Sequence, residues 1–353
     1  MRLDELREKI DLIDNQILKL LIQRSDWVKK VNVVKEAKDI HNFSPAREAD
    51  ILRRIKKLNK KQMSDADIEI IFKEILSVFR AMQGDLRIAY LGPQGTFTHL
   101  AAVKRFGKKV EYIACDSINE VFDAVEKERA DYGVVPIENS IEGVVTYTLD
   151  MFFESALKIC SEVTMDIHHN LLTSYPRNKI LRIYSHPQVL AQCRNWLAKN
   201  FPKTELVPVL STARAASEAK KDNHGACIGN KILASLYDLK MLSPHVQDVS
   251  SNITRFLIIA QNESNPSRSD KTSILFSVKD KAGALYEALQ PFKKYRINLT
   301  KIESRPSKKK AWEYYFFVDF EGHQGNPLIK KTIKELQARC SFVKILGSYP
   351  KEN

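Results

Sequence analysis

The sequence predicts three domains of different class: an all-α domain, then an α/β domain, then a small α+β domain. Residues 1–83 contain no glycine and repeat apolar side chains at helical spacing. Between residues 86 and 261, short apolar runs alternate with helical stretches, which is typical of α/β folds. Residues 271–353 follow the order strand, helix, strand, strand, helix, strand of a ferredoxin-like unit. A polar, serine-bearing stretch precedes that unit, so we place the domains at 1–84, 85–262 and 271–353.

Composition narrows the class of protein. The 353 residues carry a formal net charge of +13, yet the basic residues are dispersed and no basic stripe with interleaved aromatics is present. A lysine-rich solvated surface is therefore favoured over a nucleic-acid partner. No apolar run reaches the length of a membrane span, and the charged start of the chain is unlike a signal or transit peptide. The five cysteines stand singly without metal-ligand spacing, which favours reduced thiols in a cytoplasmic protein and no metal site.

The helical segment places charges on a face that should be buried. A seam with steps of three and four residues runs through Arg7, Ile10, Asp14, Ile17, Leu21, Arg24, Val28, Val31 and Lys35. A buried cation needs an anionic partner, which a dicarboxylate ligand could supply. A dimerisation bundle with snorkelling cations is the alternative, and the seam alone favours it.

Two further helices are expected in this segment. One begins after Ser44, an N-cap followed by Pro45, and it carries Arg47 and Glu48 in its first turn. The other begins near Ser64 and reaches Phe79, and Gln83 lies one turn further on the same face.

The α/β segment places polar residues where its predicted strands end. Thr96 follows the strand at 87–91 and lies near a helix N-terminus, which is a natural anion site. Glu138, Asn139 and Ser140 follow the strand at 132–137, at the edge where ligands bind in open α/β sheets. These three residues could equally form a turn or a helix cap. Gln192 lies in a helix after His186-Pro187, and Thr254-Arg255 precede the strand at 256–259.

The last segment contains a loop suited to a small anion. Gly283-Ala284-Leu285 lies between the strand at 272–278 and a helix, whose N-terminus suits an amino-acid carboxylate. Residues 298–306 form the next strand and include Glu303-Ser304-Arg305-Pro306. A purely structural appendage is the alternative.

Taken in order, these strings resemble one enzyme family over nearly the whole chain. They are the helical pattern of residues 1–83, Leu91-Gly92-Pro93-Gln94-Gly95-Thr96-Phe97, Val134-Val135-Pro136-Ile137-Glu138-Asn139-Ser140, Asn252-Ile253-Thr254-Arg255-Phe256 and Glu303-Ser304-Arg305-Pro306. The chain resembles the bifunctional chorismate mutase–prephenate dehydratases, which end in a phenylalanine-sensing ACT domain. The resemblance implies a three-helix mutase domain that forms an intertwined dimer with sites built from both chains. It also implies a dehydratase of two α/β subdomains, similar to a periplasmic binding protein, and a ferredoxin-like ACT domain.

The resemblance implies roles in the mutase reaction, a rearrangement that needs orientation and hydrogen-bond donors but no nucleophile. Arg7, Arg24 and Arg47 would bind the carboxylates of chorismate. Lys35 and Gln83 would face the ether oxygen, and Glu48 would bind the ring hydroxyl. Ser44 and Phe79 depart from the family pattern, which has an acid and a small or hydroxyl residue there.

In the dehydratase the resemblance implies that Thr254 protonates the hydroxyl that leaves prephenate. The residues expected to orient that substrate are Thr96, Glu138, Asn139, Ser140, Gln192 and Arg255. The effector L-phenylalanine would bind Gly283, Ala284, Leu285, Asn298, Leu299, Glu303, Ser304 and Arg305. Tyr286 replaces a frequent valine.

We therefore expect a cytoplasmic enzyme that converts chorismate to prephenate and prephenate to phenylpyruvate, with no cofactor, no metal, no nucleic acid and no membrane partner. We expect inhibition by L-phenylalanine and a homodimer or larger homo-oligomer. Two alternatives stay open: an enzyme with dehydratase activity only, whose helical domain serves as a dimeriser, and a non-enzymatic amino-acid-binding regulator. Thr254 argues against the regulator, because a sensor needs no proton donor.

Overall fold

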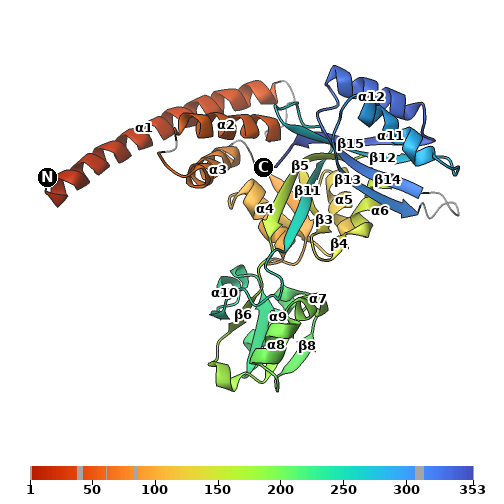
Figure 1. Cartoon of the computed structure of the whole chain (residues 1–353). Helices are drawn as coiled ribbons and strands as arrows, with labels where there is room; N and C mark the ends of the chain where they lie inside the picture. Colours follow the sequence, from red (N-terminus) through yellow and green to blue (C-terminus); the bar gives the residue numbers. More distant parts are fainter. Residues whose placement is uncertain are drawn as a thin grey trace. The chain divides into compact units, whose positions relative to one another are not determined.

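A computed structural model describes residues 2–37, 43–60, 62–82, 84, 86–306 and 314–352. The chain forms two compact units. One consists of residues 1–86 with 106–111, and the other of residues 87–105 with 112–353 (Figure 1). Among the described residues, no helix combines the length and the apolar character that a membrane crossing requires.

Three helices make up most of the first unit, as the sequence predicted: α1 (Leu3–Glu36), α2 (Pro45–Leu58) and α3 (Asp65–Ala81). Pro45 occupies the first turn of α2, and the Ser64 hydroxyl accepts a hydrogen bond from the Asp67 amide to cap α3. The 34 residues of α1 extend over about 51 Å. Many apolar side chains of α1 are exposed, among them Leu6, Ile10, Ile13, Ile17, Trp27 and Val31. This helix therefore has an apolar surface that its own chain leaves uncovered.

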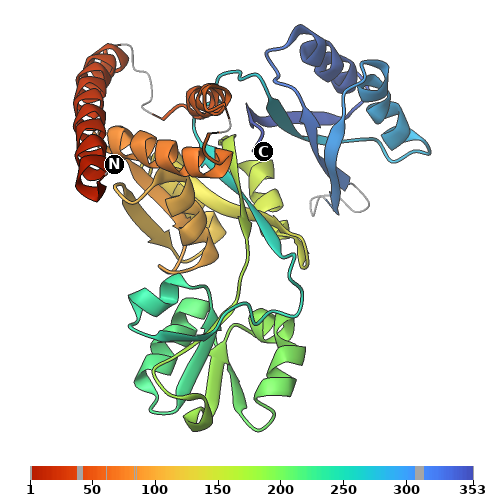
Figure 2. The same ribbon diagram turned by 60° about the vertical axis from the view of Figure 1, so that its left-hand side comes forward.

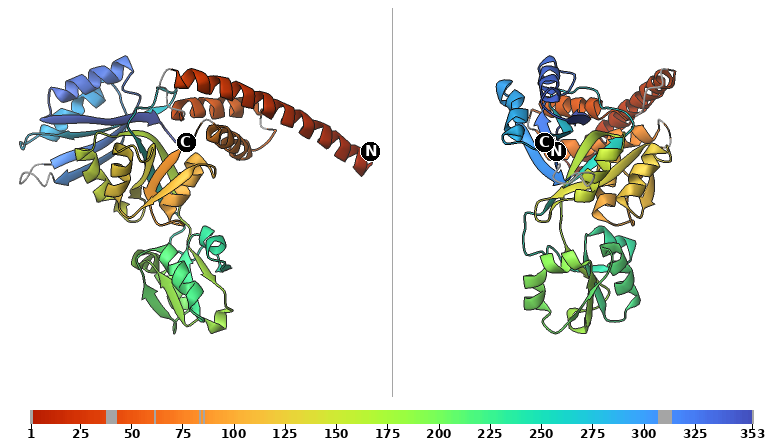
Figure 3. Two further views of the ribbon diagram at one scale, coloured as in Figure 1. Left: turned by 180° about the vertical axis from the view of Figure 1, so that it is seen from behind. Right: turned by 90° about the vertical axis from the view of Figure 1, so that its right-hand side faces the viewer.

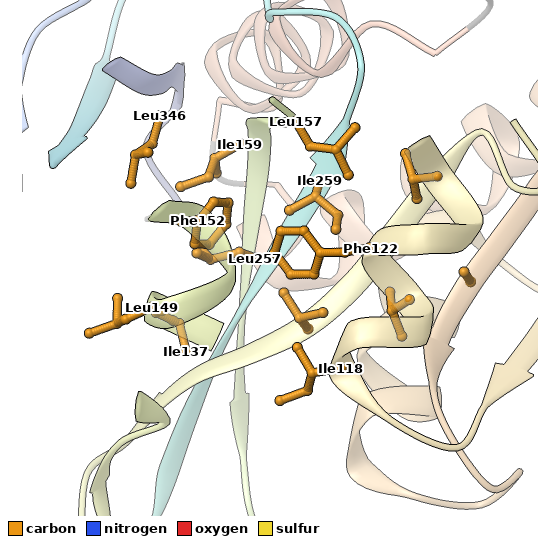
Figure 4. Close-up of a cluster of buried hydrophobic side chains, with 14 of the residues drawn as sticks. Ile118, Phe122, Ile137, Leu149, Phe152, Leu157, Ile159, Leu257, Ile259 and Leu346 are labelled. Atoms are coloured by element: carbon orange, nitrogen blue, oxygen red, sulfur yellow. The ribbon is translucent and has the colours of Figure 1, made fainter. Parts of the chain in front are cut away.

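The second unit begins with an α/β lobe built on one mixed sheet. The strand order is β2-β1-β3-β11-β5, and β4 pairs with β3. The strands are β1 (Arg87–Leu91), β2 (Glu111–Cys115), β3 (Tyr132–Asn139), β4 (Gly143–Val144), β5 (Lys158–Asp166) and β11 (Ile253–Ala260). The helices are α4 (Phe97–Phe106), α5 (Ile118–Glu126) and α6 (Thr146–Glu154). Figure 4 shows the core of this lobe, where Phe122 and Phe152 pack edge to face with ring centroids 5.2 Å apart.

A second α/β lobe is inserted between β5 and β11. Its sheet has the order β10-β6-β9-β7-β8. The strands are β6 (Asn170–Thr173), β7 (Arg182–Ser185), β8 (Glu205–Pro208), β9 (Gly225–Gly229) and β10 (Lys240–Ser243). The helices are η1 (Arg177–Lys179), α7 (Pro187–Gln192), α8 (Arg194–Asn200), α9 (Thr212–Lys221) and α10 (Ile232–Leu236). Two segments, residues 167–169 and 244–252, join the lobes, and Figure 2 shows the narrow waist that they form. The predicted pair of α/β subdomains is confirmed.

The C-terminal domain has the predicted order of elements. They are β12 (Asp270–Ser277), α11 (Ala284–Lys294), β13 (Leu299–Pro306), β14 (Tyr314–Glu321), α12 (Pro327–Gln337) and β15 (Phe342–Pro350), with sheet order β13-β14-β12-β15. Strand β15 packs on β5 of the first lobe (Figure 3). Gly347 permits that approach, because a Cβ there would lie 2.1 Å from the Ile159 carbonyl oxygen. Leu346 and Tyr349 join the core of the first lobe, so these two domains share a buried interface.

Candidate active sites

In the helical unit, Arg24 of α1 lies against α3. Its guanidinium carbon lies 4.3 Å from the centroid of the Phe79 ring. The Nη1 atom is buried without a hydrogen-bond partner among the described residues, and burial lowers the pKa of Arg24. A buried, unsatisfied donor is costly, and an anionic ligand would satisfy it. Phe79, the departure from the family pattern, thus packs against one of the predicted carboxylate-binding residues.

Lys35 and Glu48 lie near one another where α1 ends and α2 begins. Burial lowers the pKa of Lys35, and the charge of Glu48 acts in the opposite direction. The Glu48 carboxylate is also engaged by Arg80 of α3, whose Nε lies 3.1 Å from Oε1. Arg80 is only 6% exposed. Arg80 therefore holds the Glu48 carboxylate in place. The sequence analysis did not identify this buried cation.

A sequence signal for Arg80 was present. It follows the buried Leu76 by four residues and therefore lies on the apolar face of α3. The reasoning applied to cations on the α1 seam would have selected it.

The other predicted mutase residues are scattered in one chain. Arg7 is exposed and lies 3.6 Å from the carboxylate of Asp4. Because Arg7 and Lys35 are 28 residues apart in α1, about 42 Å separates them at roughly 1.5 Å per residue. Arg47 is exposed in the first turn of α2, and Gln83 lies outside the described residues. One chain alone does not gather these side chains.

Two of the predicted dehydratase residues, Asn139 and Thr254, in contrast, meet directly. Strand β11 includes Thr254 and Arg255, and β3 extends to Asn139, so these residues lie within strands rather than beside them as predicted. Thr254 pairs with Asn139 across the two antiparallel strands. Asn139 Nδ2 donates to Thr254 Oγ1 at 2.8 Å, while Asn139 Oδ1 accepts from the Ile141 and Glu142 amides at 3.0 Å. The Thr254 oxygen thus accepts a hydrogen bond, and its own proton is left for donation.

Gln192 and Ser140 lie beside this pair. Gln192 Oε1 accepts from Asn252 Nδ2 at 3.1 Å, and Gln192 Nε2 donates to Glu142 Oε1 at 2.8 Å. The Ser140 hydroxyl accepts from the Ile253 amide at 2.9 Å, which fixes the start of β11. Thr96 caps the start of α4, since its hydroxyl donates to the Leu91 carbonyl at 3.1 Å and accepts from the His99 amide at 3.3 Å.

Arg255 is directed toward the C-terminal domain. Arg255 is 8% exposed, and its guanidinium donates to Glu162 at 2.7 Å, to Glu138 at 3.0 Å and to the Tyr349 hydroxyl at 2.9 Å. It also forms an ion pair with Asp319 at 2.6 Å. Burial opposes its charge, but these surrounding groups raise the pKa of Arg255 above its ordinary value. The predicted substrate-orienting arginine therefore binds four protein side chains.

Glu138 belongs to the same network. It binds Arg255 and, from the C-terminal domain, Lys301 of β13. Burial opposes the charge of Glu138, yet the Lys301 ammonium and Arg255 hold its pKa below the ordinary value. Lys271 of β12 binds Glu162 at 2.9 Å, so buried charges join the two domains beside Thr254.

The predicted effector loop lines a hollow of about 240 Å³. Gly283, Ala284 and Leu285 form one side, and Tyr314 and Phe316 of β14 form another. Gly283 has φ +78, a left-handed conformation that favours glycine, and α11 begins directly after it.

The predicted effector residues of β13 have other surroundings. Arg305 donates to both carboxylate oxygens of Asp150 in α6 at 3.1 Å. Ser304 is exposed and pairs with Phe316, while Glu303 is half-buried. Asn298 and Leu299 lie at the opposite end of the strand, where Leu299 pairs with Phe320. The structure thus gathers Gly283, Ala284 and Leu285 but not the whole predicted set.

Three family descriptions match the chain in sequence: chorismate mutase type II over residues 6–84, prephenate dehydratase over 88–264 and ACT domain over 272–338. The bifunctional chorismate mutase/prephenate dehydratase of Aquifex aeolicus is 47% identical over 99% of this chain and 98% of its own length. The chain belongs to the bifunctional chorismate mutase/prephenate dehydratase family. It is an enzyme with a mutase domain, a dehydratase domain and an ACT domain, as the sequence predicted.

Two further relatives cover the second and third domains. A prephenate dehydratase of Methanocaldococcus jannaschii is 41% identical over 74% of this chain and 97% of its own length. The crystal structure of a prephenate dehydratase from Arthrobacter aurescens in complex with L-Phe has a TM-score of 0.70 and 32% identity, covering 75% of this chain and 90% of that chain. Family membership favours the bifunctional enzyme over a dehydratase with an inert helical domain and over a non-enzymatic regulator.

Proposed function

We propose that Thr254 is the general acid of the dehydratase reaction. Loss of CO2 from prephenate drives electrons into the ring and expels the ring hydroxyl, to which Thr254 gives its proton. The departing group then leaves as water, and the ring becomes aromatic. The observation that carries this role is the hydrogen bond from Asn139 to Thr254 Oγ1, because a donor to that oxygen stabilises the negative charge that develops on it.

For the mutase reaction, we propose a site shared between two copies of α1. A second copy running antiparallel would bring its Arg7 to the Lys35 end of the first. The length of α1 and its uncovered apolar side chains support this arrangement. Arg24, Arg47 and the second copy's Arg7 would bind the carboxylates of chorismate. Lys35 and Gln83 would donate to the ether oxygen while Glu48, supported by Arg80, binds the ring hydroxyl.

One assay tests both reactions. Purified protein is incubated with chorismate, and prephenate and phenylpyruvate are measured separately over time. We expect prephenate to appear first and phenylpyruvate to follow. Phenylpyruvate from added prephenate without any prephenate from chorismate would overturn the mutase assignment and leave the dehydratase assignment standing.

L-Phenylalanine is proposed as an inhibitor that binds the hollow at Gly283, Ala284 and Leu285. The backbone at the start of α11 suits the amino-acid carboxylate, and Phe316 and Tyr314 offer an aromatic wall. Three charged contacts would carry the effect to the dehydratase lobe: Arg255 with Asp319, Lys301 with Glu138 and Arg305 with Asp150. The L-Phe complex of the Arthrobacter relative supports the effector class.

Calorimetric titration of L-phenylalanine tests this site. A truncated chain is unsuitable, because removal of the ACT domain would strip Asp319 and Tyr349 from the buried Arg255. Gly283→Ala instead adds a methyl group at φ +78, and we expect weaker phenylalanine binding. Gly143→Ala is the matched control, since Gly143 has φ +83 and equally open space in another domain. Binding that is unchanged in Gly283→Ala and competitive with prephenate would place the effector in the substrate site.

A cytoplasmic location is also proposed. All five cysteines are free, and four are buried. Burial raises the pKa of Cys160 and Cys227 to about 12, so these thiols stay protonated and inert. Unpaired thiols of this kind are usual in a reducing compartment.

A further inference from the structure

A buried histidine lies at the waist of the dehydratase, outside every role assigned above. His169 belongs to the first segment that joins the two lobes, and it is 1% exposed. Its Nε2 lies 2.9 Å from Gln192 Oε1. Its Nδ1 is buried and has no hydrogen-bond partner among the described residues.

The proton on this ring can be assigned from its surroundings. The Glu142 carboxylate only accepts, so the amide group that faces it must be the Gln192 nitrogen. Gln192 Oε1 therefore faces His169 and accepts from it, which puts the imidazole proton on Nε2. Burial lowers the pKa of His169, in agreement with a neutral ring.

A continuous chain of hydrogen bonds connects His169 with Thr254. Gln192 Oε1 also accepts from Asn252 Nδ2 at 3.1 Å. Asn252 Oδ1 then accepts from Asn139 Nδ2 at 2.6 Å, and the same Asn139 nitrogen donates to Thr254 Oγ1 at 2.8 Å. Each of the three amides has only one orientation that satisfies both of its neighbours. Which atom donates and which accepts is therefore fixed at every link between His169 and Thr254.

These hydrogen bonds connect both lobes of the domain and the two segments that join them. Gln192 ends α7 of the second lobe, whereas Asn139 and Thr254 belong to the first lobe. His169 and Asn252 lie in the two segments that join the lobes, at the waist visible in Figure 2. The hydrogen bonds thus tie the second lobe to the strand that carries the acid.

We propose that His169 is a positioning residue for the dehydratase reaction: its Nε2–H, together with the Glu142 carboxylate, holds the Gln192 amide in place, and through Asn252 this amide keeps the Asn139–Thr254 pair in register with the second lobe. This inference rests on the proposed role of Thr254. His169 itself takes no part in proton transfer. Its contribution should appear in kcat more than in KM, because it acts on the arrangement of the reacting groups.

Two neutral substitutions separate positioning from packing. The amide nitrogen of a glutamine at position 169 can lie about where the histidine Nε2 lies. The amide nitrogen of an asparagine is one bond closer to the backbone and reaches only the position of Nδ1. We expect His169→Asn to lower kcat for prephenate roughly tenfold, the effect of one lost hydrogen bond of ordinary strength. His169→Gln should stay within about threefold of wild type, and both variants should keep wild-type mutase activity and similar unfolding temperatures.

A double variant tests the route through Gln192. In a Gln192→Ala background, His169→Asn should cause little further loss, because the group that it orients is gone. Equal activity of His169→Asn and wild type would overturn the proposal, as would equal losses in the Asn and Gln variants, which indicate packing alone. Thr254→Ala is measured alongside: a normal rate there contradicts the acid assignment, whereas an inactive Thr254→Ala beside a fully active His169→Asn contradicts only the role of His169.

Discussion

The two catalytic regions of this chain are assembled in different ways. In the helical unit, Arg7, Arg24 and Lys35 are spaced along one 34-residue helix whose apolar side chains are widely exposed. In the two-lobed domain, Asn139, Thr254 and Gln192 are joined within one chain by a short series of hydrogen bonds. In our proposals, the first site requires a second copy of the chain, whereas the second requires the two lobes to stay in register. Changes to oligomer contacts and changes to lobe contacts should therefore separate the two activities.

Thr254→Ala should separate the dehydratase activity from the mutase activity by the largest factor. General acids contribute roughly 10²- to 10⁴-fold to rate, so dehydratase kcat should fall by that order. The strand should persist, because Thr254 keeps its backbone pairing with Asn139 and Met165. Mutase activity, measured as prephenate formed from chorismate, should be unchanged.

Thr254→Ser supplies the control for this change, since it keeps the hydroxyl and removes only a methyl group. It should recover most of the dehydratase rate. A Thr254→Ala enzyme that turns over prephenate at the wild-type rate would remove the residue from the reaction.

Lys35→Ala should have the opposite effect, a loss of mutase activity with dehydratase activity retained. Loss of one donor aimed at a developing charge typically costs about 3 kcal/mol of barrier, or roughly a hundredfold in rate. Chorismate turnover should fall by that factor while prephenate turnover stays normal. Lys29→Ala is the matched control, because Lys29 is an exposed lysine of the same helix. Equal effects of the two lysine substitutions would mean that general charge, and not a directed donor, is responsible.

A mixed-dimer experiment tests whether the mutase site is shared. Arg7→Ala and Lys35→Ala each remove one side of the proposed site and should each be nearly inactive. If the variants are unfolded and refolded together, half of the dimers are mixed, and each mixed dimer holds one intact site of two. Mutase activity should then recover to about a quarter of the wild-type value. No recovery from a mixture shown by mass spectrometry to contain mixed dimers would place both residues in one chain's site.

The sequence predicted local features well because neighbouring residues determine them. Ser44-Pro45 predicted the start of α2, and Gly283 was correctly placed between a strand and the helix that begins directly after it. Contacts between distant segments were not predictable in this way. Arg255 contacts Tyr349, which lies 94 residues away in sequence. Asp319 and Tyr349 lie in strands, and nothing in the sequence around them marks them as partners of Arg255. Likewise His169, Asn252 and Gln192 come from three segments whose meeting depends on how the lobes pack.

The smallest effect concerns regulation, which should act on only one of the two sites. Arg305 of β13 meets Asp150 of α6 at 3.1 Å, and both side chains are partly exposed. Such a pair contributes at most about 1 kcal/mol, so its loss can change coupling by only about two- to fivefold. Asp150→Asn should therefore raise the phenylalanine concentration that half-inhibits the dehydratase by that factor, because the contact between effector domain and catalytic lobe is weakened.

Asp123→Asn is the matched control, since the Asp123 ion pair with Lys127 lies within α5 and the turn that follows. Inhibition curves for both variants, together with calorimetric titration of phenylalanine, decide the point: reduced inhibition with unchanged binding in Asp150→Asn supports a coupling contact, whereas reduced binding would place Arg305 at the effector site itself.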